Sequence, residues 1–338
     1  MTHRLKVLVA CSQYEYGNPA WGHSYEYRNV YESLADVFES VTLFDFVALS
    51  KEMPREGMNR RLLKEVEEER PDWVVIVPFK NELMPEVVGE LRARTVTTGY
   101  FFDDFWRVEF TQRWGKYLTY FTTSDVNGVS RHKEAGCQNV IFSPFGYNHR
   151  RYQKLEEIDK KYDVTFVGQY HPYRAWVLGR LRRAGIDVSA WGIRWANTHQ
   201  LSQEDMVRVF NQSRINLNLS NSVCWDLRYL VSSPRALRNT LLSAKTRESI
   251  KGRHFEIPGS GGFQLSYYAE GLERVYRIGE EIAIYNDVED LVWKIRHYLR
   301  HEDEREEVAT RAHARSLSEH TMEQRMLALA RASGVCSS

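Results

Sequence analysis

The chain carries an arginine and a glutamate three residues apart, Arg253 and Glu256, directly before a Pro-Gly-Ser-Gly-Gly run. Side chains at this spacing lie on one face of a helical turn, so we expect the two to be neighbours. A guanidinium binds phosphate oxygens through paired hydrogen bonds, and an ionised carboxylate accepts hydrogen bonds from both hydroxyls of a diol. A ribose that carries a diphosphate offers both kinds of group. The pair therefore predicts a site for a nucleotide sugar, with a plain helix-end salt bridge as the alternative for Glu256.

The glycines of this run, Gly261 and Gly262, stand between a predicted helix over 247–257 and a predicted strand over 262–266. The turn thus closes a helix and opens a strand, whereas a dinucleotide-binding G-x-G-x-x-G follows a strand and opens a helix. This order excludes a dehydrogenase fingerprint at this place. Glycine lets the backbone approach a ligand closely, so both residues are candidates for donor contact, with a simple turn as the alternative.

Other candidates for donor binding lie where predicted strands of the second half end, or where the next helix begins. Ligands bind outside the carboxyl ends of strands in such sheets, and phosphates bind at helix N-termini. Arg174 and Lys251 would contact the diphosphate, with solvated helix ends as alternatives, and Trp191 would pack on the base unless it is a core residue. The full set for donor binding is Gly168, Arg174, Trp191, Gly192, Asn218, Lys251, Arg253, Glu256, Gly261 and Gly262.

Four residues of the first half are candidates for the catalytic base that takes a proton from an acceptor hydroxyl: His23, Glu26, Asp103 and Asp104. Histidine titrates near neutral pH, and a base needs hydrogen-bond reach to the hydroxyl. The two aspartates follow a predicted strand over 95–102, where adjacent side chains can diverge. The alternatives are an ordinary loop histidine and a helix-capping glutamate. The acids form D-D rather than a D-x-D metal signature, and the histidines show no clustered ligand spacing, so we expect no metal site.

The region around Glu256 resembles the C-terminal half of the CgeB-like glycosyltransferases, which are similar to the group 1 glycosyltransferases of GT-B fold. In that family the position of Glu256 holds the hydroxyls of the donor ribose. The resemblance covers residues 160–325 and, more thinly, 1–150. The matching segments are Asp163–Gln169, Arg253–Ser266, Tyr285–Leu291, Arg296–Leu299, Arg305 and His320–Thr321, with Gly22–Glu26 and Phe101–Asp104 in the first half.

The resemblance implies an α/β protein of GT-B architecture, with two Rossmann-like domains facing a cleft and a C-terminal helix that crosses back. We expect an acceptor-side domain over 1–150, a nucleotide-sugar-binding domain over 160–315, and a terminal helix and tail over 316–338. The implied activity is that of a hexosyl- or pentosyltransferase that uses a nucleotide-diphosphate sugar as co-substrate, without a metal or cofactor. The acceptor would be a glycan, a protein or a small molecule.

Two alternatives to this function stay open. One is an enzyme of the same fold that glycosylates a modified DNA base. The other is a non-catalytic protein that binds a nucleotide sugar or a glycan and needs no base in its first domain.

The elements that would position these residues form two successive series of strands alternating with helices, a pattern typical of open parallel sheets. The 338 residues suffice for two cores of ordinary size. The stretch between the series, 146–161, is polar and charged, as expected for a linker. The predicted strands are 5–10, 41–46, 73–78, 95–102, 121–124, 140–143, 162–167, 187–191, 214–219, 262–266 and 281–285.

Charge and composition narrow the function classes further. The formal net charge is +1, so no overall field draws the chain to nucleic acid or an anionic membrane, although arginine-rich runs such as 228–238 leave a local patch open. The four cysteines are scattered without a disulfide framework, as expected for reduced thiols. No apolar run approaches the roughly 18 residues that a membrane span needs, and no secretory signal precedes the first strand. We therefore expect a cytoplasmic protein without a membrane span.

Overall fold

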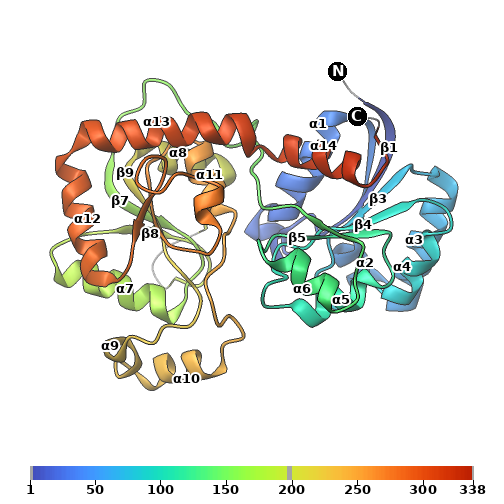
Figure 1. Ribbon diagram of the computed structural model, residues 1–338, viewed down its shortest axis with the longest axis horizontal. Coiled ribbons are helices and arrows are strands. Elements are labelled where there is room, and N and C mark those ends of the chain that lie inside the picture. The colour runs from blue at the N-terminus through green and yellow to red at the C-terminus, as the bar shows by residue number, and fades with distance from the viewer. Residues whose placement is uncertain (1–2, 196–199, 337–338) are drawn as a thin grey trace. The chain divides into compact units, whose positions relative to one another are not determined.

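The structure is a computed structural model that describes residues 3–195 and 200–336. The chain forms two compact units (Figure 1): Met1–Asn148 together with Thr321–Ser338, and His149–His320. Each unit is built on one parallel sheet. Residues 1–2 of the expected range 1–150 and residues 337–338 of the expected range 316–338 lie outside the described residues. Nowhere in the described chain does a helix combine the length and the apolar character that crossing a bilayer requires.

The first unit has a six-stranded sheet in the order β2-β1-β3-β4-β5-β6. Its strands are β1 His3–Ala10, β2 Phe38–Phe44, β3 Trp73–Ile76, β4 Val96–Gly99, β5 Tyr120–Thr123 and β6 Val140–Phe142. Its helices are a π-helical turn Tyr27–Tyr31 that leads into α1 Glu32–Val37, then α2 Phe46–Glu52, α3 Arg55–Glu69, α4 Pro85–Leu91, α5 Val108–Gly115, α6 Gly128–Glu134 and, from the end of the chain, α14 Met322–Ala332.

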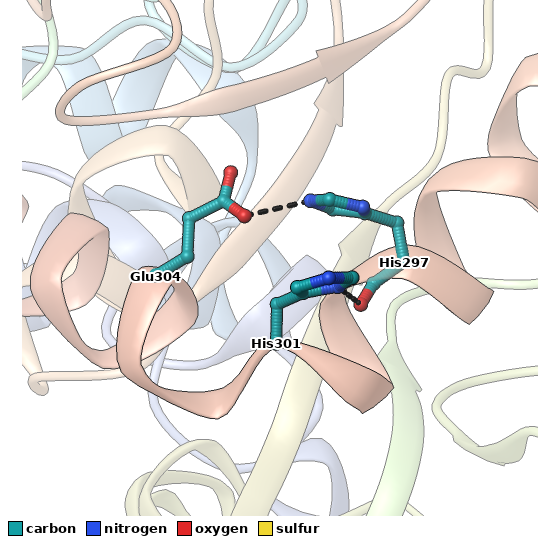
Figure 2. Close-up of side chains that lie close together, drawn as sticks. All are labelled: His297, His301 and Glu304. Atoms are coloured by element: carbon teal, nitrogen blue, oxygen red, sulfur yellow. Dashed lines mark hydrogen bonds and ion pairs between the residues drawn. The ribbon is translucent and has the colours of Figure 1, made fainter.

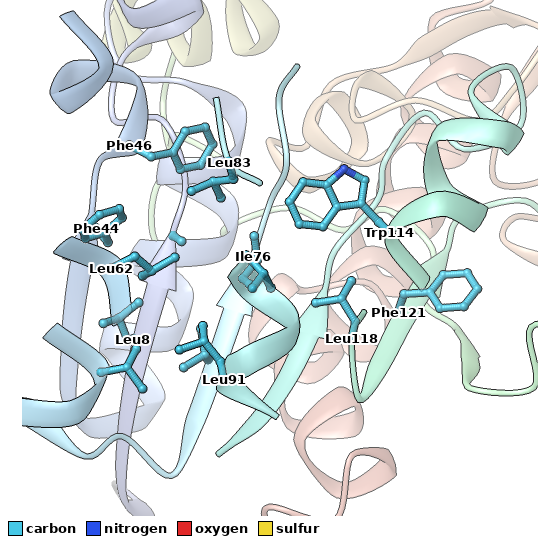
Figure 3. Packing of buried hydrophobic residues seen from close by; sticks show 14 of the residues in the cluster. Leu8, Phe44, Phe46, Leu62, Ile76, Leu83, Leu91, Trp114, Leu118 and Phe121 are labelled. Carbon is cyan, nitrogen blue, oxygen red and sulfur yellow. The ribbon is translucent and has the colours of Figure 1, made fainter. Parts of the chain in front are cut away.

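Buried apolar side chains cover both faces of this sheet. On one face, side chains of β1 and β3 pack against helices α2 to α5 (Figure 3). On the other face, Val9 and Trp73 pack in one cluster with Met322 and Met326 of α14. The last helix thus packs on the first sheet, which confirms the expectation of a C-terminal helix that crosses back.

The second unit has a five-stranded sheet in the order β11-β10-β9-β7-β8. Its strands are β7 Tyr162–Val167, β8 Ser189–Trp191, β9 Ser213–Asn218, β10 Gln264–Tyr267 and β11 Ala283–Tyr285. Its helices are α7 Pro172–Arg183, α8 Gln203–Gln212, α9 Leu227–Leu230, α10 Pro234–Leu242, α11 Arg253–Gly259, α12 Val288–Arg300 and α13 Glu302–Glu319. Every strand pairing in both sheets is parallel.

The boundary expected after residue 315 falls inside α13. The change from the second unit to the first comes instead at Thr321, the residue that caps α14. Its hydroxyl accepts a hydrogen bond from the backbone N–H of Gln324, and the Gln324 side chain accepts one from Thr321 N–H. This reciprocal pair starts a new helix, so α13 and α14 are separate helices.

Every predicted strand is present, with the predicted ends over 162–167 and shifted ends elsewhere, but the predicted helix over 247–257 begins only at Arg253. The chain before it is held by the loop after β9. Val223 N–H donates to the Lys245 carbonyl oxygen at 2.9 Å, and Ser222 Oγ donates to the Arg247 carbonyl oxygen at 2.9 Å. These hydrogen bonds between segments distant in sequence take the place of the bonds that a helix would make within itself. Helices α2, α5, α6, α9 and α10 were not expected from the sequence.

Two glycines bring the turns after β7 and β8 into contact at the carboxyl edge of the second sheet. The N–H of Gly168 donates to the carbonyl oxygen of Trp191 at 2.9 Å. A Cβ on Gly192 would lie 2.2 Å from the carbonyl oxygen of Gly168, and the φ angle of Gly192 is +142°. Backbone atoms cannot move aside as a flexible side chain can, so this contact requires glycine at residue 192.

Replacing Gly192 by alanine should therefore destabilise the protein by about 2–4 kcal/mol, since the added methyl meets backbone in a strained conformation. Gly179→Ala is the matched control, because Gly179 lies within α7 with open space around its Cβ position. The control should be neutral or stabilising by about 1 kcal/mol. Urea unfolding followed by circular dichroism measures both, and equal effects would contradict the proposed contact.

Candidate functional site

The strand order of the second unit reverses between β7 and β9. β8 pairs on one side of β7, whereas β9, β10 and β11 follow on the other side. In open parallel sheets, ligands bind outside the carboxyl ends of the strands at such a reversal. Polar side chains gather around these strand ends, and we call them the switch-point cluster: Arg174, Asn218, Glu248, Arg253, His254 and Glu256.

Arg174, on the first turn of α7 as predicted, joins the loops that follow β7 and β9. Its Nε donates to the carbonyl oxygens of Leu219 at 3.0 Å and Ser220 at 3.1 Å, and Nη1 donates to that of Gln169 at 2.9 Å. Burial lowers the pKa of Arg174 to about 10, which leaves it a cation at neutral pH. Within the described residues Nη2 makes no hydrogen bond. The side chain therefore holds the two loops of the carboxyl edge together, and its Nη2 remains as a hydrogen-bond donor for an anion.

Arg253 and Glu256 form an ion pair on the first turn of α11, as their spacing predicts. Arg253 Nε also donates to the carbonyl oxygen of Val167, the last residue of β7, at 3.2 Å. Glu256 is 2% exposed, and the Tyr152 hydroxyl donates to its Oε1 at 2.7 Å. The helix-end salt bridge named as the alternative is thus present, and a ribose would have to share or replace these bonds.

His254 lies at the centre of a buried polar network. Its Nε2 lies 3.1 Å from Ser266 Oγ and 3.2 Å from Asn218 Nδ2, and its Nδ1 accepts from Lys251 N–H at 3.0 Å. Burial lowers the pKa of His254 to about 4, so the ring is neutral at pH 7. Asn218, predicted to bind the donor, is 4% exposed and supports the edge from within.

Glu248 is an acidic member of the cluster that we did not predict. Its Oε1 accepts a hydrogen bond from Ser220 Oγ in the loop after β9. Burial raises the pKa of Glu248, while hydrogen bonds from serine hydroxyls and the charges of Lys251 and Arg174 act in the opposite direction. No local spacing singles out this residue, because the Ser220 hydroxyl and the Arg174 charge that act on it come from distant segments. A carboxylate flanked by two cations suits a ligand that carries both hydroxyls and negative charge.

Three predicted donor-binding residues lie away from the cluster. The turn with Gly261 and Gly262 leads into the first residue of β10, so it lies at the amino edge of the sheet. A Cβ on Gly262 would lie 2.8 Å from the Asn216 amide nitrogen. The ring of Trp191 packs edge-on against Tyr162, the first residue of β7, at 5.3 Å. These placements favour the turn alternative for the two glycines, and they hold the half-buried ring of Trp191 against β7.

Trp195 is an aromatic residue of the carboxyl edge that the sequence did not reveal. Its Nε1 donates to the carbonyl oxygen of Gly168 at 2.9 Å, and its ring lies 5.2 Å from that of Tyr170. Gly168 is therefore enclosed by Trp195 on one side and Gly192 on the other. This arrangement places Trp195, rather than Trp191, beside the loop after β7.

In the first unit, His23 lies in the segment that follows β1. Its ring is stacked between those of Tyr14, at 5.1 Å, and Tyr27, at 4.5 Å. Its Nδ1 is buried and has no hydrogen-bond partner among the described residues. A buried polar atom without a partner is uncommon in a folded protein, and it marks a place where a ligand or a water can bind.

Glu26 lies on the same segment and has a strongly perturbed pKa. Burial raises the pKa of Glu26 to about 8, and the negative charges of Glu15 and Asp45 add to the rise. Asp45 directly follows β2, so the group lies beside the carboxyl ends of β1 and β2. A carboxyl that titrates near neutral pH is suited to acid–base catalysis.

Asp104 is enclosed in a network of its own. It is 1% exposed, accepts hydrogen bonds from Thr123 Oγ1 and from Ser124 N–H, and lies 3.2 Å from His132 Nε2. These partners occupy both carboxylate oxygens, which favours a structural role. Asp103 is only half-buried. The two pairs of base candidates follow strands that are not adjacent, since β3 separates β1 from β4, and the rings of Tyr25 and Phe102 beside them lie 5.0 Å apart.

A possible cation site lies at the end of α12, and it corrects our expectation that the histidines show no clustered spacing. His297, His301 and Glu304 each offer a ligand atom, and these atoms lie within 4.8 Å of one another (Figure 2). Their H-x-x-x-H spacing places both rings on one helix face. Since α12 begins just after β11 and runs away from the carboxyl edge, this group lies at the far end from the switch-point cluster.

Comparison with known proteins gives two findings. A family model described as "Glycosyl transferase-like" matches residues 174–331, a segment that includes the whole switch-point cluster. Comparison with curated protein sequences found no match.

Similar solved structures cover nearly the whole chain. HepE of Anabaena, in complex with UDP and glucose, is 10% identical with a TM-score of 0.62, over 98% of this chain and 100% of that one. A sucrose-phosphate synthase from Thermosynechococcus elongatus is 10% identical with a TM-score of 0.62, over 97% and 98%. A glycosyltransferase from Rickettsia africae is 10% identical with a TM-score of 0.63, over 98% of each.

Likeness at this level of identity shows the fold, and the family match covers most of the second unit together with α14. The two parallel sheets, each in Rossmann-like order, and the returning α14 form the GT-B fold, as the resemblance implied. The chain therefore has a GT-B fold, and its residues 174–331 match the family model described as "Glycosyl transferase-like".

Proposed function

We propose that the protein is a glycosyltransferase that transfers a sugar from a UDP-linked donor to an acceptor hydroxyl. The observation that carries this proposal is the switch-point cluster, in which two arginines and two glutamates lie around the ends of β7 and β9. The cluster falls within the family match. HepE, solved with UDP and glucose and also with UDP-glucose, supports uracil as the base of the donor.

Arg174 and Arg253 are the proposed ligands of the diphosphate. The two side chains are close enough that the charge of Arg253 lowers the pKa of Arg174. An anion beside both relieves the repulsion between them. When the bond from the anomeric carbon to the diphosphate breaks, negative charge grows on the leaving group, and fixed cations stabilise that charge most in the transition state. Lys251, whose charge acts on Glu248, adds a third positive group. We infer that these side chains replace a metal ion.

Glu256 and Glu248 are the proposed partners of donor hydroxyls. Glu256 already accepts a hydroxyl hydrogen bond from Tyr152, so its Oε1 has the geometry that a ribose hydroxyl would use. Glu248 is more exposed and lies in the loop before α11, where it would meet the transferred sugar. Both assignments use the same property, since an ionised carboxylate only accepts hydrogen bonds and a sugar supplies donors.

Glu26 is the proposed base on the acceptor side. The acceptor oxygen forms a bond to the anomeric carbon, its proton passes to the Glu26 carboxylate, and UDP leaves with the electrons of the broken bond. A pKa near 8 makes the carboxylate a strong enough base to take this proton. His23 is the second candidate, because its buried Nδ1 has no partner within the described chain.

A thermal-shift screen tests the donor assignment directly. UDP should stabilise the protein by about 2.7 kcal/mol at about 100 times its dissociation constant, because it binds only the folded state. GDP, dTDP and NAD should give smaller shifts at the same concentration. The proposed replacement of metal by arginines predicts equal UDP shifts with magnesium and with EDTA. Stabilisation by NAD alone would contradict the donor assignment.

Glu256→Gln should weaken UDP binding by about 10- to 100-fold, because a charged hydrogen bond to the ribose contributes about 1.5–3 kcal/mol. Glutamine keeps the size of the side chain and can still accept from Tyr152. The control is Glu307→Gln, an exposed residue of α13 that pairs with Arg311. Titration calorimetry measures the affinity, and the unfolding temperature shows whether the variant is folded. Unchanged UDP affinity in a folded Glu256→Gln variant would refute this role.

The rate of UDP-sugar turnover should rise with pH through about 8, because Glu26 must lose its proton before it acts as a base. Glu26→Gln should lower kcat by about 100-fold and remove this rise, with UDP affinity unchanged. The raised pKa also predicts that unfolding free energy falls from about pH 5 to pH 8, since the unfolded carboxyl deprotonates first. Glu39→Gln, exposed on β2, is the control. A wild-type pH profile in Glu26→Gln would rule Glu26 out.

A further inference from the structure

The segment from Trp225 to Leu242, which we call the α9–α10 hairpin, extends from the second unit between β9 and α11 (Figure 1). Six of its large apolar residues are each 45 to 82% exposed to solvent. No other short segment of the described chain exposes as many. The exposed apolar residues of the hairpin are Trp225, Leu227, Val231, Leu237, Leu241 and Leu242. Several large apolar side chains exposed on one short segment of a folded protein mark a binding surface.

The exposed residues are not a misplaced core, because the inner face of the hairpin is already filled. Tyr229 is 1% exposed and packs between the rings of Tyr173, at 5.4 Å, and Trp176, at 5.6 Å, on α7. Ala236 and Thr240 of α10 are buried as well. The hairpin therefore anchors itself with one face and presents leucines, a valine and a tryptophan on the other.

This segment carries a net positive charge, with the three arginines Arg228, Arg235 and Arg238 against one acidic residue, Asp226. From Leu227 to Arg247 the sequence has no acidic residue, and its basic residues are Arg228, Arg235, Arg238, Lys245 and Arg247. Arg228 pairs with Asp226 and with Glu289 at the start of α12, which ties α9 to the unit. Arg235 and Arg238 are exposed and form no ion pair within the described chain. Cations thus lie among the exposed apolar side chains.

We propose that the α9–α10 hairpin docks the protein on an anionic lipid bilayer. Leucine and tryptophan side chains enter the boundary between headgroups and acyl chains, while arginines bind lipid phosphates. Tryptophan prefers this interfacial depth. A second copy of the chain fits less well, because a symmetric contact through the same face would bring like charges together. Nucleic acid fits less well because phosphates offer nothing to exposed leucines.

Vesicle flotation tests this proposal on the full chain. The protein should float with vesicles of phosphatidylcholine that contain about one third phosphatidylglycerol, and much less with phosphatidylcholine alone. The triple variant Leu237→Ser, Leu241→Ser, Leu242→Ser should lower the partition by about 10-fold or more. Arg235→Gln with Arg238→Gln should lower it by about 5-fold and reduce its dependence on salt. Both sets are exposed, so the variants should keep the unfolding temperature and the UDP affinity of the parent.

Matched controls come from exposed residues elsewhere. Leu317→Ser on α13 tests an exposed leucine, and Arg60→Gln with Arg61→Gln on α3 tests an exposed arginine pair; neither should change flotation. Failure of the parent to float, or flotation that survives the triple serine variant, would overturn the proposal. A dimer in light scattering that the triple variant dissociates, without lipid binding, would assign the hairpin to self-association. A gel shift of duplex DNA that only the arginine variant abolishes would assign it to nucleic acid.

Discussion

The buried guanidinium of Arg174 is the interaction on which the carboxyl edge of the second sheet depends. Its hydrogen bonds to three backbone carbonyl oxygens tie together the loops after β7 and β9, where the strand order reverses. Because an arginine stays charged even at a lowered pKa, the edge holds a fixed positive charge. Arg253 brings a second charge to the end of β7, and Glu256 compensates it. Stability and ligand chemistry thus share the same residues.

The two units use one topology for different chemistry. In each sheet the first strand is flanked by the second strand on one side and by the third on the other. At this reversal the second unit carries the arginine cations and the glutamate carboxylates of the switch-point cluster. The first unit instead carries Glu26, with a pKa raised by burial, and the stacked His23. One unit is therefore suited to an anionic ligand and the other to proton transfer.

The fold was predictable because buried parallel strands appear as short apolar runs separated by helical segments. The Arg253–Glu256 pair was predictable because residues three apart on a helix are neighbours. Glu248 was not, because its hydrogen bond with Ser220 and the Arg174 charge that acts on it come from segments distant in sequence. Trp191 and Trp195 flank one turn, and no local pattern shows that Trp195 is the one whose Nε1 donates to Gly168 in the loop after β7.

The most direct test of the account is hydrogen–deuterium exchange of the full chain with and without UDP. The switch-point cluster predicts slower exchange in residues 168–174, 219–222 and 248–256, which surround the ends of β7 and β9. It predicts no change in the turn over 260–263, at the amino edge, or in residues 297–304 at the end of α12. Protection confined to the amino edge or to the first unit would contradict the central claim.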